Sequence, residues 1–477
     1  MINYIEFISK EKSMLIAPAG FGKTHTIAEC LKNIENKEKQ LILTHTHAGV
    51  ASIKEKIKKE GIPNSIFEVE TITSFAQKYV LAFYTGNDLP NQEDSKLYYP
   101  FIIEKAITLF KLKPIRQIIF NTYKGLFVDE YQDCIVSQHN LVLSLAEILP
   151  THILGDFLQG IFGFNEEQLV DLNDPLAMKG FIDAKYELDK PQRWLNGNNA
   201  ALGADLKSIR EDIIGKKEVD LTKYSSIELK LITEQDLYNP MTNYCQQIRK
   251  LLKEKSVLLL HPDSTSVYPR LKIIKTFNNG FTLVESIDDK EFYTLAKEAD
   301  LITKENIRIN LVALCKKIFN KTGVDNWFNE KGLKKKNRPE DKAQLTSIET
   351  QINSFEKEFS FFKFAQLLRD VKNLSEIKCY RKELFKTLCK AIEEAELQQI
   401  SVFESMNNKR NQTRRIGRKI YGRCIGTTLL TKGLEFDTVA ILNAHKFECP
   451  KHLYVAMTRA SKRLIVFTNK STLNPYK

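Results

Sequence analysis

The sequence predicts an α/β protein with two parallel sheets, each carrying a short helical insertion. In residues 1–75, short apolar runs such as "SMLIAPAG" and "QLILTHT" alternate with helical segments. The apolar runs "SVLLLHP" (256–262) and "DTVAILNA" (437–444) repeat this pattern near the C-terminus. Strands without polar alternation are typical of parallel sheets that are covered by helices on both faces. The length of 477 residues allows several such units.

The first unit is built from four buried strands. "SMLIAPAG" is expected to end in a glycine-rich turn, and "KTHTIAECLKNI" to form the helix after it. "QLILTHT" and "AGVASIKEKIKKEG" give the next strand and helix, the latter closed by Gly61. "GLFVDE" and "THILGD" supply two more buried strands. We assign 1–77 and 119–178 to this unit and 78–118 to a short helical insertion.

The second unit is expected over residues 179–290 and 416–477, with "KRLIVFT" (462–468) as its last strand. Between these parts, residues 291–415 are rich in Lys, Glu and Phe at helical spacing and predict a helical insertion. Within it, "KGLKKKNRPEDK" (331–342) is expected to be an exposed loop. The Phe stripe of "SFEKEFSFFKFAQLLRDV" (354–371) could stack bases. Core packing of an amphipathic helix is the stronger expectation.

The composition favours an anionic partner and a cytoplasmic location. A net charge of +12 and a pI near 9.0 suit a polyanion, although a solvated lysine-rich surface is the alternative. The eight cysteines form no C-x-x-C pair, which argues against zinc or iron–sulfur sites and fits reduced thiols. The N-terminal "MINYIEFISKEK" is charged early, unlike a signal peptide. No apolar run reaches the ~18 residues of a membrane span, so we expect no membrane contact.

A phosphate-binding loop is predicted at "APAGFGKTHT", between a strand and a helix. Gly20 and Gly22 let the backbone N–H groups face a phosphate, and the helix N-terminus adds partial positive charge. Lys23 is expected to reach the β- and γ-phosphates, and Thr24 to ligate Mg²⁺. The nucleotide contacts that we expect in this stretch are Ala17, Pro18, Ala19, Gly20, Phe21, Gly22, Lys23, Thr24 and His25.

The acids of "LFVDEYQDC" follow a buried strand. Burying carboxylates without a partner is unfavourable, so such a cluster predicts a cation or a reacting group nearby. Asp129 is the candidate Mg²⁺ ligand. Glu130 is placed to accept a proton from the water that attacks the γ-phosphate. A purely structural cluster is the alternative.

Eight stretches, in order from 17 to 468, together resemble the motifs of the UvrD/Rep-like superfamily 1 DNA helicases. They are "APAGFGKT", "LTHTHAGVASIKEKI", "TITSFA", "VDEYQD", "LGDFLQGIFGF", "ELDKPQRW", "TTLLTKGLEFDTVAIL" and "LYVAMTRASKRLIV". The resemblance implies two RecA-like P-loop motor domains with the ATP site between them. It also implies that Gln159 senses the γ-phosphate, that Arg193 and Arg459 are arginine fingers, and that Gly433 and Glu435 contact the nucleotide. Gln132 and Asp133 would couple hydrolysis to the neighbouring domain.

The sequence departs from this family mainly where the family contacts DNA. The changed positions are His45, His47, Thr73, Asn165 (after Phe164) and Leu429, where the family has Phe, Asn, His, Arg and His. A packed or solvated histidine is the alternative at His45 and His47. The basic run "NNKRNQTRRIGRKIYGR" (407–423) could bind phosphates, or it could be a solvated linker. The candidate DNA contacts are His45, His47, Thr73, Phe164, Thr427, Arg414, Arg415 and Arg418.

The resemblance implies an ATP-dependent DNA helicase or translocase that uses ATP and Mg²⁺ and moves 3′ to 5′ on single-stranded DNA, in antiphage defence or DNA repair. A regulatory, DNA-sensing ATPase is the second hypothesis. Its cycle would control an OLD-family nuclease, as in Gabija antiphage systems, whose helicase-like subunit this chain resembles in size. A nucleotide-binding protein without nucleic acid is a third. The N-terminal segment lacks the Gln with which the family reads adenine, so the nucleotide base is left open.

Overall fold

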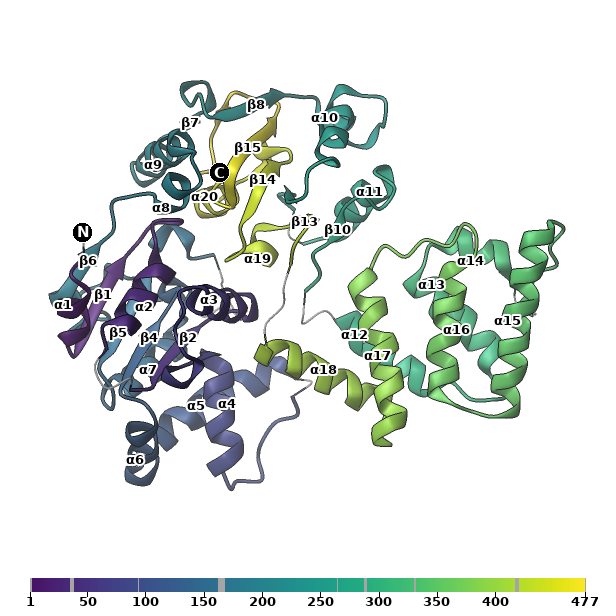
Figure 1. Cartoon of the computed structure of the whole chain (residues 1–477), viewed down its shortest axis with the longest axis horizontal. Helices are drawn as coiled ribbons and strands as arrows, with labels where there is room; N and C mark the ends of the chain where they lie inside the picture. Colours follow the sequence, from purple (N-terminus) through teal and green to yellow (C-terminus); the bar gives the residue numbers. More distant parts are fainter. Residues whose placement is uncertain are drawn as a thin grey trace.

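The computed structural model describes residues 2–34, 38–92, 94–161, 168–263, 265–286, 290–329, 332–416 and 420–476. The side chains of Ala48 and of residues 414–416 are outside this description. Two six-stranded sheets lie one above the other, and a helical region extends to one side of them (Figure 1). The predicted α/β class with two parallel sheets is confirmed.

The first sheet has the strand order β3-β2-β4-β5-β1-β6, and all its pairs are parallel. Its strands are β1 (Lys12–Ile16), β2 (Gln40–Thr44), β3 (Phe67–Thr71), β4 (Gly125–Val128), β5 (Thr151–Gly155) and β6 (Lys185–Glu187). The four apolar runs that predicted strands are β1, β2, β4 and β5. Because β6 pairs with β1, the first unit continues through Glu187, beyond the limit at 178 that we expected. Parallel strands place all their carboxyl ends, and the loops that follow them, at one edge.

Helices cover both faces of this sheet. They are α1 (Tyr4–Ser9), α2 (Lys23–Lys32), α3 (His47–Lys59), α4 (Ile72–Phe83), α5 (Ser95–Phe110), α6 (Lys113–Thr122) and α7 (Val136–Ala146). One core packs α2 and α3 against one face of the sheet. A second core packs the helices α4, α5, α6 and α7 against the other face of the sheet. The expected insertion at 78–118 therefore has no core of its own: Ile102 and Phe110 pack in the core of the sheet.

The second sheet is also parallel, with the order β10-β13-β9-β14-β15-β8. Its strands are β8 (Ile227–Leu231), β9 (Val257–Leu260), β10 (Thr282–Leu283), β13 (Arg423–Gly426), β14 (Phe436–Ile441) and β15 (Ala460–Thr468). Its helices are α8 (Gln192–Asn196), α9 (Ala200–Ile214), α10 (Asn243–Leu251), α11 (Tyr268–Thr276), α19 (Thr428–Thr431) and α20 (Pro450–Met457). A small antiparallel ribbon joins β7 (Val219–Asp220) to β16 (Thr472–Leu473). The predicted strands are β9, β14 and β15.

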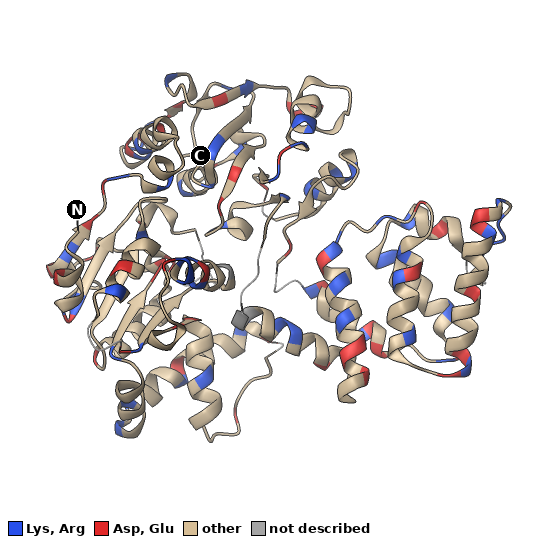
Figure 2. Cartoon of the chain, viewed as in Figure 1, with Lys and Arg blue, Asp and Glu red and all other residues tan. Residues whose placement is uncertain are grey.

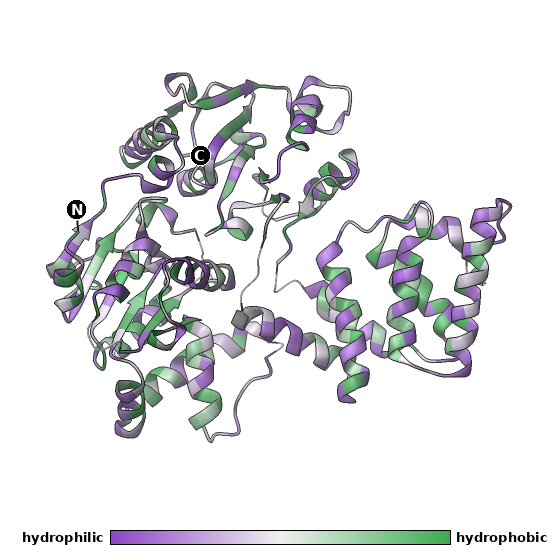
Figure 3. Ribbon diagram, in the orientation of Figure 1, coloured by the Kyte–Doolittle hydropathy of each residue, from purple (hydrophilic) through white to green (hydrophobic). Residues whose placement is uncertain are grey.

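The insertion, residues 290–416, has its own hydrophobic core. Its helices are α12 (Lys290–Asp300), α13 (Ile307–Ile318), α14 (Lys321–Trp327), α15 (Pro339–Lys357), α16 (Phe361–Asn373), α17 (Lys382–Gln398) and α18 (Val402–Ile416), with the hairpin β11 (Phe328–Asn329) and β12 (Gly332–Leu333). Apolar and polar residues alternate along each helix, as amphipathic packing requires (Figure 3). Phe355 and Phe364 are fully buried, so the central part of the Phe stripe packs the core.

The last helix of the insertion returns to the first unit (Figure 1). α18 contacts α3, and Gln92 Nε2 donates to Asn411 Oδ1 at 2.9 Å. Arg410, part of the basic run 407–423, is buried, with its guanidinium over the rings of Phe292 and Tyr293. This arginine supports the packing of the insertion and is not available to a ligand at the surface. In the described parts of the chain, no helix is long and apolar enough to cross a bilayer.

Candidate active site

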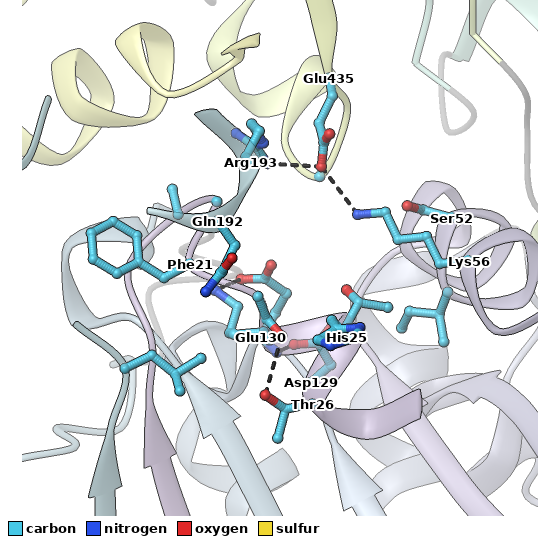
Figure 4. A pocket seen from close by; sticks show the side chains of 18 of the residues that line it. Phe21, His25, Thr26, Ser52, Lys56, Asp129, Glu130, Gln192, Arg193 and Glu435 are labelled. Carbon is cyan, nitrogen blue, oxygen red and sulfur yellow. Dashed lines mark hydrogen bonds and ion pairs between the residues drawn. The ribbon is translucent and has the colours of Figure 1, made fainter. Parts of the chain in front are cut away.

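A cavity of about 850 Å³ lies between the two units. The first unit lines it with the loop after β1, with α3 and with the end of β4. The second unit lines it with residues from α8, from the turn before β14 and from the start of β15 (Figure 4). The predicted site residues that line the cavity are Pro18, Ala19, Gly20, Phe21, Gly22, Lys23, Thr24, His25, Asp129, Glu130, Gln159, Arg193, Gly433, Glu435 and Arg459. Ala17 is fully buried behind the loop.

The loop after β1 has the backbone that phosphate binding needs. Gly20 and Gly22 have φ values of 77° and 109°, which L side chains rarely adopt. A Cβ on Gly20 would lie 2.7 Å from a ring carbon of Trp194, so a larger residue does not fit there. Lys23 opens α2 and is buried, with Nζ 3.3 Å from the Ala17 carbonyl oxygen. The helix N-terminus and the buried ammonium both favour an anion at this point.

The acid pair follows β4, as the sequence predicted. Asp129 is buried, and its Oδ1 accepts from the Glu130 N–H at 2.9 Å. Glu130 has φ 58°, in the left-handed region, which is uncommon for a residue other than glycine. Such strained backbone is found preferentially at functional sites. Glu130 Oε2 lies 3.7 Å from Lys23 Nζ, which brings the acid pair and the phosphate loop together.

The pKa values of the two acids are shifted in opposite directions. Burial, together with the negative charge of Glu130, raises the pKa of Asp129 to about 6. Burial also raises the pKa of Glu130, but the charges of Lys23 and Lys432 outweigh it and hold that pKa at about 2. Glu130 is therefore ionised at neutral pH and can accept a hydrogen bond from water. Asp129 is a buried carboxylate that a cation would stabilise, and with the Thr24 hydroxyl it provides the oxygen ligands that Mg²⁺ prefers.

Arg193 and Glu435 form an ion pair at the wall of the cavity. Arg193 Nη2 lies 2.8 Å from Glu435 Oε1, and Nη1 donates to the Thr458 carbonyl. Lys56 from α3 approaches the same carboxylate oxygen at 3.0 Å, from the first unit (Figure 4). The Arg193 charge is the main reason that the pKa of Glu435 lies well below its ordinary value. Glu435 therefore joins two cations that belong to different units.

Arg459 and Gln159 form a second contact between the units. Arg459 is buried, and its Nη2 donates to Gln159 Oε1 at 3.2 Å. Burial and the nearby Arg193 charge lower the pKa of Arg459 to about 10, so the guanidinium stays protonated at neutral pH. Gln159 Nε2 in turn donates to Asp156 Oδ2 at 2.9 Å. The predicted γ-phosphate sensor thus already contacts a predicted arginine finger.

Asp156 is a functional residue that sequence reasoning missed. Its carboxylate is fully buried and accepts from the Ala19 N–H at 3.2 Å, in the phosphate loop. It also pairs with Arg210 of α9, whose Nη1 lies 2.7 Å from Asp156 Oδ1. The carboxylate therefore connects the phosphate loop, Gln159 and the second unit. Asp156 lies in the motif "LGDFLQGIFGF", but no role was predicted for it. Arg210 lies in none of the motifs.

Lys432 and Asp133 form another buried ion pair between the units. Lys432 Nζ also donates to the Gln159 carbonyl. Gln132, for which we predicted a coupling role, contacts Asp156: its Oε1 accepts from the Asp156 N–H at 2.8 Å. Contacts between the two units thus also come from residues without a predicted role, among them Lys56, Asp156, Arg210 and Lys432.

Removing Arg210 is expected to weaken the junction of the units strongly. Arg210→Ala leaves the Asp156 carboxylate buried without its cation, a change that costs about 3–5 kcal/mol in buried pairs. The free energy of unfolding, measured by urea denaturation, should fall by that order. Lys207→Ala is the matched control, because Lys207 is exposed on the same helix. Equal stability of the two variants would contradict the role of this ion pair.

Two candidate DNA contacts have enclosed side chains in the structure, and they stay predictions. His45 lines the nucleotide cavity, with Nε2 3.3 Å from Cys134 Sγ, and burial lowers its pKa to about 3. Thr427 is buried and caps α19. Neither side chain lies on an outer surface. The sequence could not show that Lys432, from the other unit, lies near His45.

The other candidate DNA contacts stay predictions. His47 and Thr73 are half-buried, at the start of α3 and in the first turn of α4. Phe164 and Arg418 lie outside the described residues, and Arg414 and Arg415 are described only as backbone of α18.

Comparison with protein families finds helicase-type domains in both halves of the chain. Residues 3–165 match the family described as "AAA domain". Residues 341–468 match the family described as "Viral superfamily 1 RNA helicase core domain". These two matches include the phosphate loop and the acid pair on one side, and Gly433, Glu435 and Arg459 on the other.

Two similar bacterial proteins each match only part of the chain. An ATP-dependent helicase/nuclease subunit of Lactococcus lactis subsp. lactis (strain IL1403) is 26% identical over 244 residues, which are 47% of this chain and 20% of that protein. The exonuclease/helicase subunit RexA of Lactococcus lactis subsp. cremoris (strain MG1363) is 26% identical over 151 residues, 30% of this chain and 12% of that protein. The chain thus aligns with about a fifth or less of the length of these relatives.

Among solved structures, the arterivirus nonstructural protein 10 helicase in complex with DNA covers 97% of this chain, and the match covers 62% of that chain. Its sequence identity is 11%, and its TM-score of 0.34 is too low to support an argument.

Proposed function

We propose that this chain carries a superfamily 1 helicase core, which hydrolyses ATP with Mg²⁺ and couples hydrolysis to movement along single-stranded DNA. The observation that carries the proposal is the cavity to which both units contribute. A nucleotide bound there would contact both units at once, so its binding and hydrolysis would change how they pack. The 3′ to 5′ direction comes from the resemblance to UvrD/Rep-like helicases.

The residues divide into four groups by role. Lys23 and the backbone N–H groups of Gly20 and Gly22 bind the phosphates, and His25, Gly433 and Glu435 contact the rest of the nucleotide. Thr24 and Asp129 hold Mg²⁺, which when bound neutralises charge on the phosphate oxygens. Glu130 orients the attacking water and accepts its proton. Gln159, Arg193 and Arg459 stabilise the charge on the transferring phosphoryl group.

The contacts around the cavity suggest how the nucleotide acts on the two units. Arg193 binds Glu435, and Arg459 binds Gln159. A γ-phosphate offers both guanidiniums a better anionic partner, so ATP binding should exchange these contacts for contacts with the phosphate. The exchange moves the second unit relative to the first, which is the type of closure that commits a substrate to reaction.

The proposal is tested by ATP hydrolysis measured with and without single-stranded DNA. We expect DNA to raise the steady-state rate, because DNA that bridges the units would favour the closed cavity. Lys23→Ala is the control for contaminating activity and should abolish the rate under both conditions. A rate that DNA leaves unchanged would contradict coupling to DNA, and a rate that Lys23→Ala leaves unchanged would contradict the site itself.

A second candidate function is that of a regulatory motor protein controlling a nuclease. It is favoured by the names of the relatives, which are helicase/nuclease or exonuclease/helicase subunits, and by the altered DNA-facing residues. An OLD-family nuclease, as in Gabija antiphage systems, is one such partner; the comparisons do not support that finer assignment. Hydrolysis that appears only when a nuclease partner is added would favour this candidate over a helicase that acts alone.

A further inference from the structure

A second cavity, of about 410 Å³, lies in the insertion between α16 and α17. Seven residues line it: Arg369, Lys372, Lys382, Phe385, Lys386, Cys389 and Lys390. Five of the seven are cationic, and no acidic residue is among them. The cavity shares no lining residue with the nucleotide cavity.

Three of the lysines form a row along one face of α17. Lys382, Lys386 and Lys390 are each four residues apart, and all three are exposed. Like charges at this spacing repel each other and disfavour the helix. In Figure 2, basic residues recur along this helix, on the side of the insertion that faces the motor units. The three positive charges repel one another, and a bound anionic ligand would relieve this repulsion.

Several other basic residues of the insertion are paired with carboxylates. Lys316 pairs with Asp325, Lys317 with Glu298, Lys363 with Glu358 and Lys409 with Glu394. The four cavity lysines show no carboxylate within 4 Å among the described residues. Arg369 is the exception in the cavity, since it lies 2.6 Å from Glu393. Near the start of α17, Glu285 and Glu291 are already paired with Arg381.

The floor of this cavity is apolar. Phe385 and Cys389 are buried, and Lys372 Nζ lies 5.3 Å from the centre of the Phe385 ring. An apolar floor under a cationic rim provides charge without directional acceptors, which suits phosphates rather than base edges. The lysine row advances by about 6 Å for every four residues along the helix. It therefore suits a polymer with successive phosphates better than one compact ion.

We propose that the α16–α17 cavity binds the phosphate backbone of a nucleic acid, as a contact separate from the motor units and independent of sequence. This inference rests on the proposed function for the identity of the ligand. α17 packs against α18, and α18 contacts α3 of the first unit. A strand held at α17 is therefore connected to the motor through packed helices.

The test is fluorescence anisotropy with a labelled single strand and a labelled tailed duplex, without nucleotide, over a range of salt concentrations. The full chain is compared with the triple variant Lys382→Gln/Lys386→Gln/Lys390→Gln. Each lost phosphate contact lowers the slope of log affinity against log salt by about 1, so we expect a slope reduced by about 2–3 and affinity reduced at least ~10-fold at low salt. DNA-independent ATP hydrolysis and the thermal midpoint should be unchanged.

The matched control is Lys321→Gln/Lys342→Gln/Lys357→Gln, which removes the same charge from exposed sites elsewhere on the insertion. Equal binding by both triple variants, whether weakened or not, would overturn the proposal, because only net charge would then matter. An effect of the cavity lysines on an acidic protein but not on DNA would also overturn it. Loss of DNA-stimulated hydrolysis with cavity binding intact would count against the proposed motor function alone.

Discussion

Replacing Arg459 with alanine should lower the rate constant of ATP hydrolysis by about 10³–10⁵, the range that arginine fingers supply in phosphoryl transfer. The guanidinium is buried at the cavity wall and is held by the Val455 and Leu434 carbonyls and by Gln159. It is thus preorganised before the transition-state charge develops, which is the condition under which such groups contribute most. Single-turnover hydrolysis at saturating ATP measures this effect apart from binding.

The control for Arg459 is Arg463→Ala, four residues later on β15. Arg463 pairs with Glu228 and Glu254 at the far side of β15 and should leave the rate unchanged. Arg459→Lys separates charge from geometry: a lysine keeps the charge but cannot form the same fork of hydrogen bonds, so it should restore little. A rate for Arg459→Ala within threefold of the unmodified chain would refute the finger assignment.

Replacing Glu130 with glutamine should lower the rate constant by about 10²–10⁴, the usual contribution of a general base. The pKa of Glu130 is held at about 2 by Lys23 and Lys432 against burial, so the native side chain is ionised throughout the physiological range. Glutamine keeps the size and can keep the contact with Gln132, but it cannot accept the proton. Affinity for a fluorescent ATP analogue should remain, because the phosphate loop is intact.

Glu147→Gln is a suitable control for Glu130, since Glu147 is an exposed acid at the end of α7. Loss of nucleotide binding together with the rate would mean that Glu130 mainly balances the charge of Lys23. Retained hydrolysis would return the general-base role to another residue.

Much of the fold follows from local sequence, and most of the exceptions have a common cause. β1, β2, β4 and β9 are buried on both faces and read as continuous apolar runs. Most strands that sequence analysis missed lie at sheet edges or are very short: β6 and β8 are partly exposed, and β10 has two residues. The exception is β13, which has four residues and lies inside the second sheet. Edge strands carry polar residues on the open side, so no apolar run marks them.

The site divides in the same way. Residues in contiguous motifs, such as Lys23, Asp129 and Glu130, were predicted and line one cavity. Arg210 and Lys56 could not be predicted, because a single cation on an amphipathic helix has the same local pattern whether it is solvated or buried against a partner. The surroundings of His45 could not be predicted for a related reason: its neighbour Lys432 comes from the other unit, almost four hundred residues along the chain.

Helix α3 contacts both the nucleotide cavity and the insertion. Its Lys56 holds Glu435 at the nucleotide cavity, while α18 of the insertion rests against the same helix. A force applied to the insertion, such as drag from a bound strand, would press on the element that carries Lys56. The ion pair between Lys56 and Glu435 would then weaken or strengthen in response to that force. The rate of ATP hydrolysis would then depend on mechanical load as well as on nucleotide concentration, with α3 transmitting the load to the nucleotide cavity.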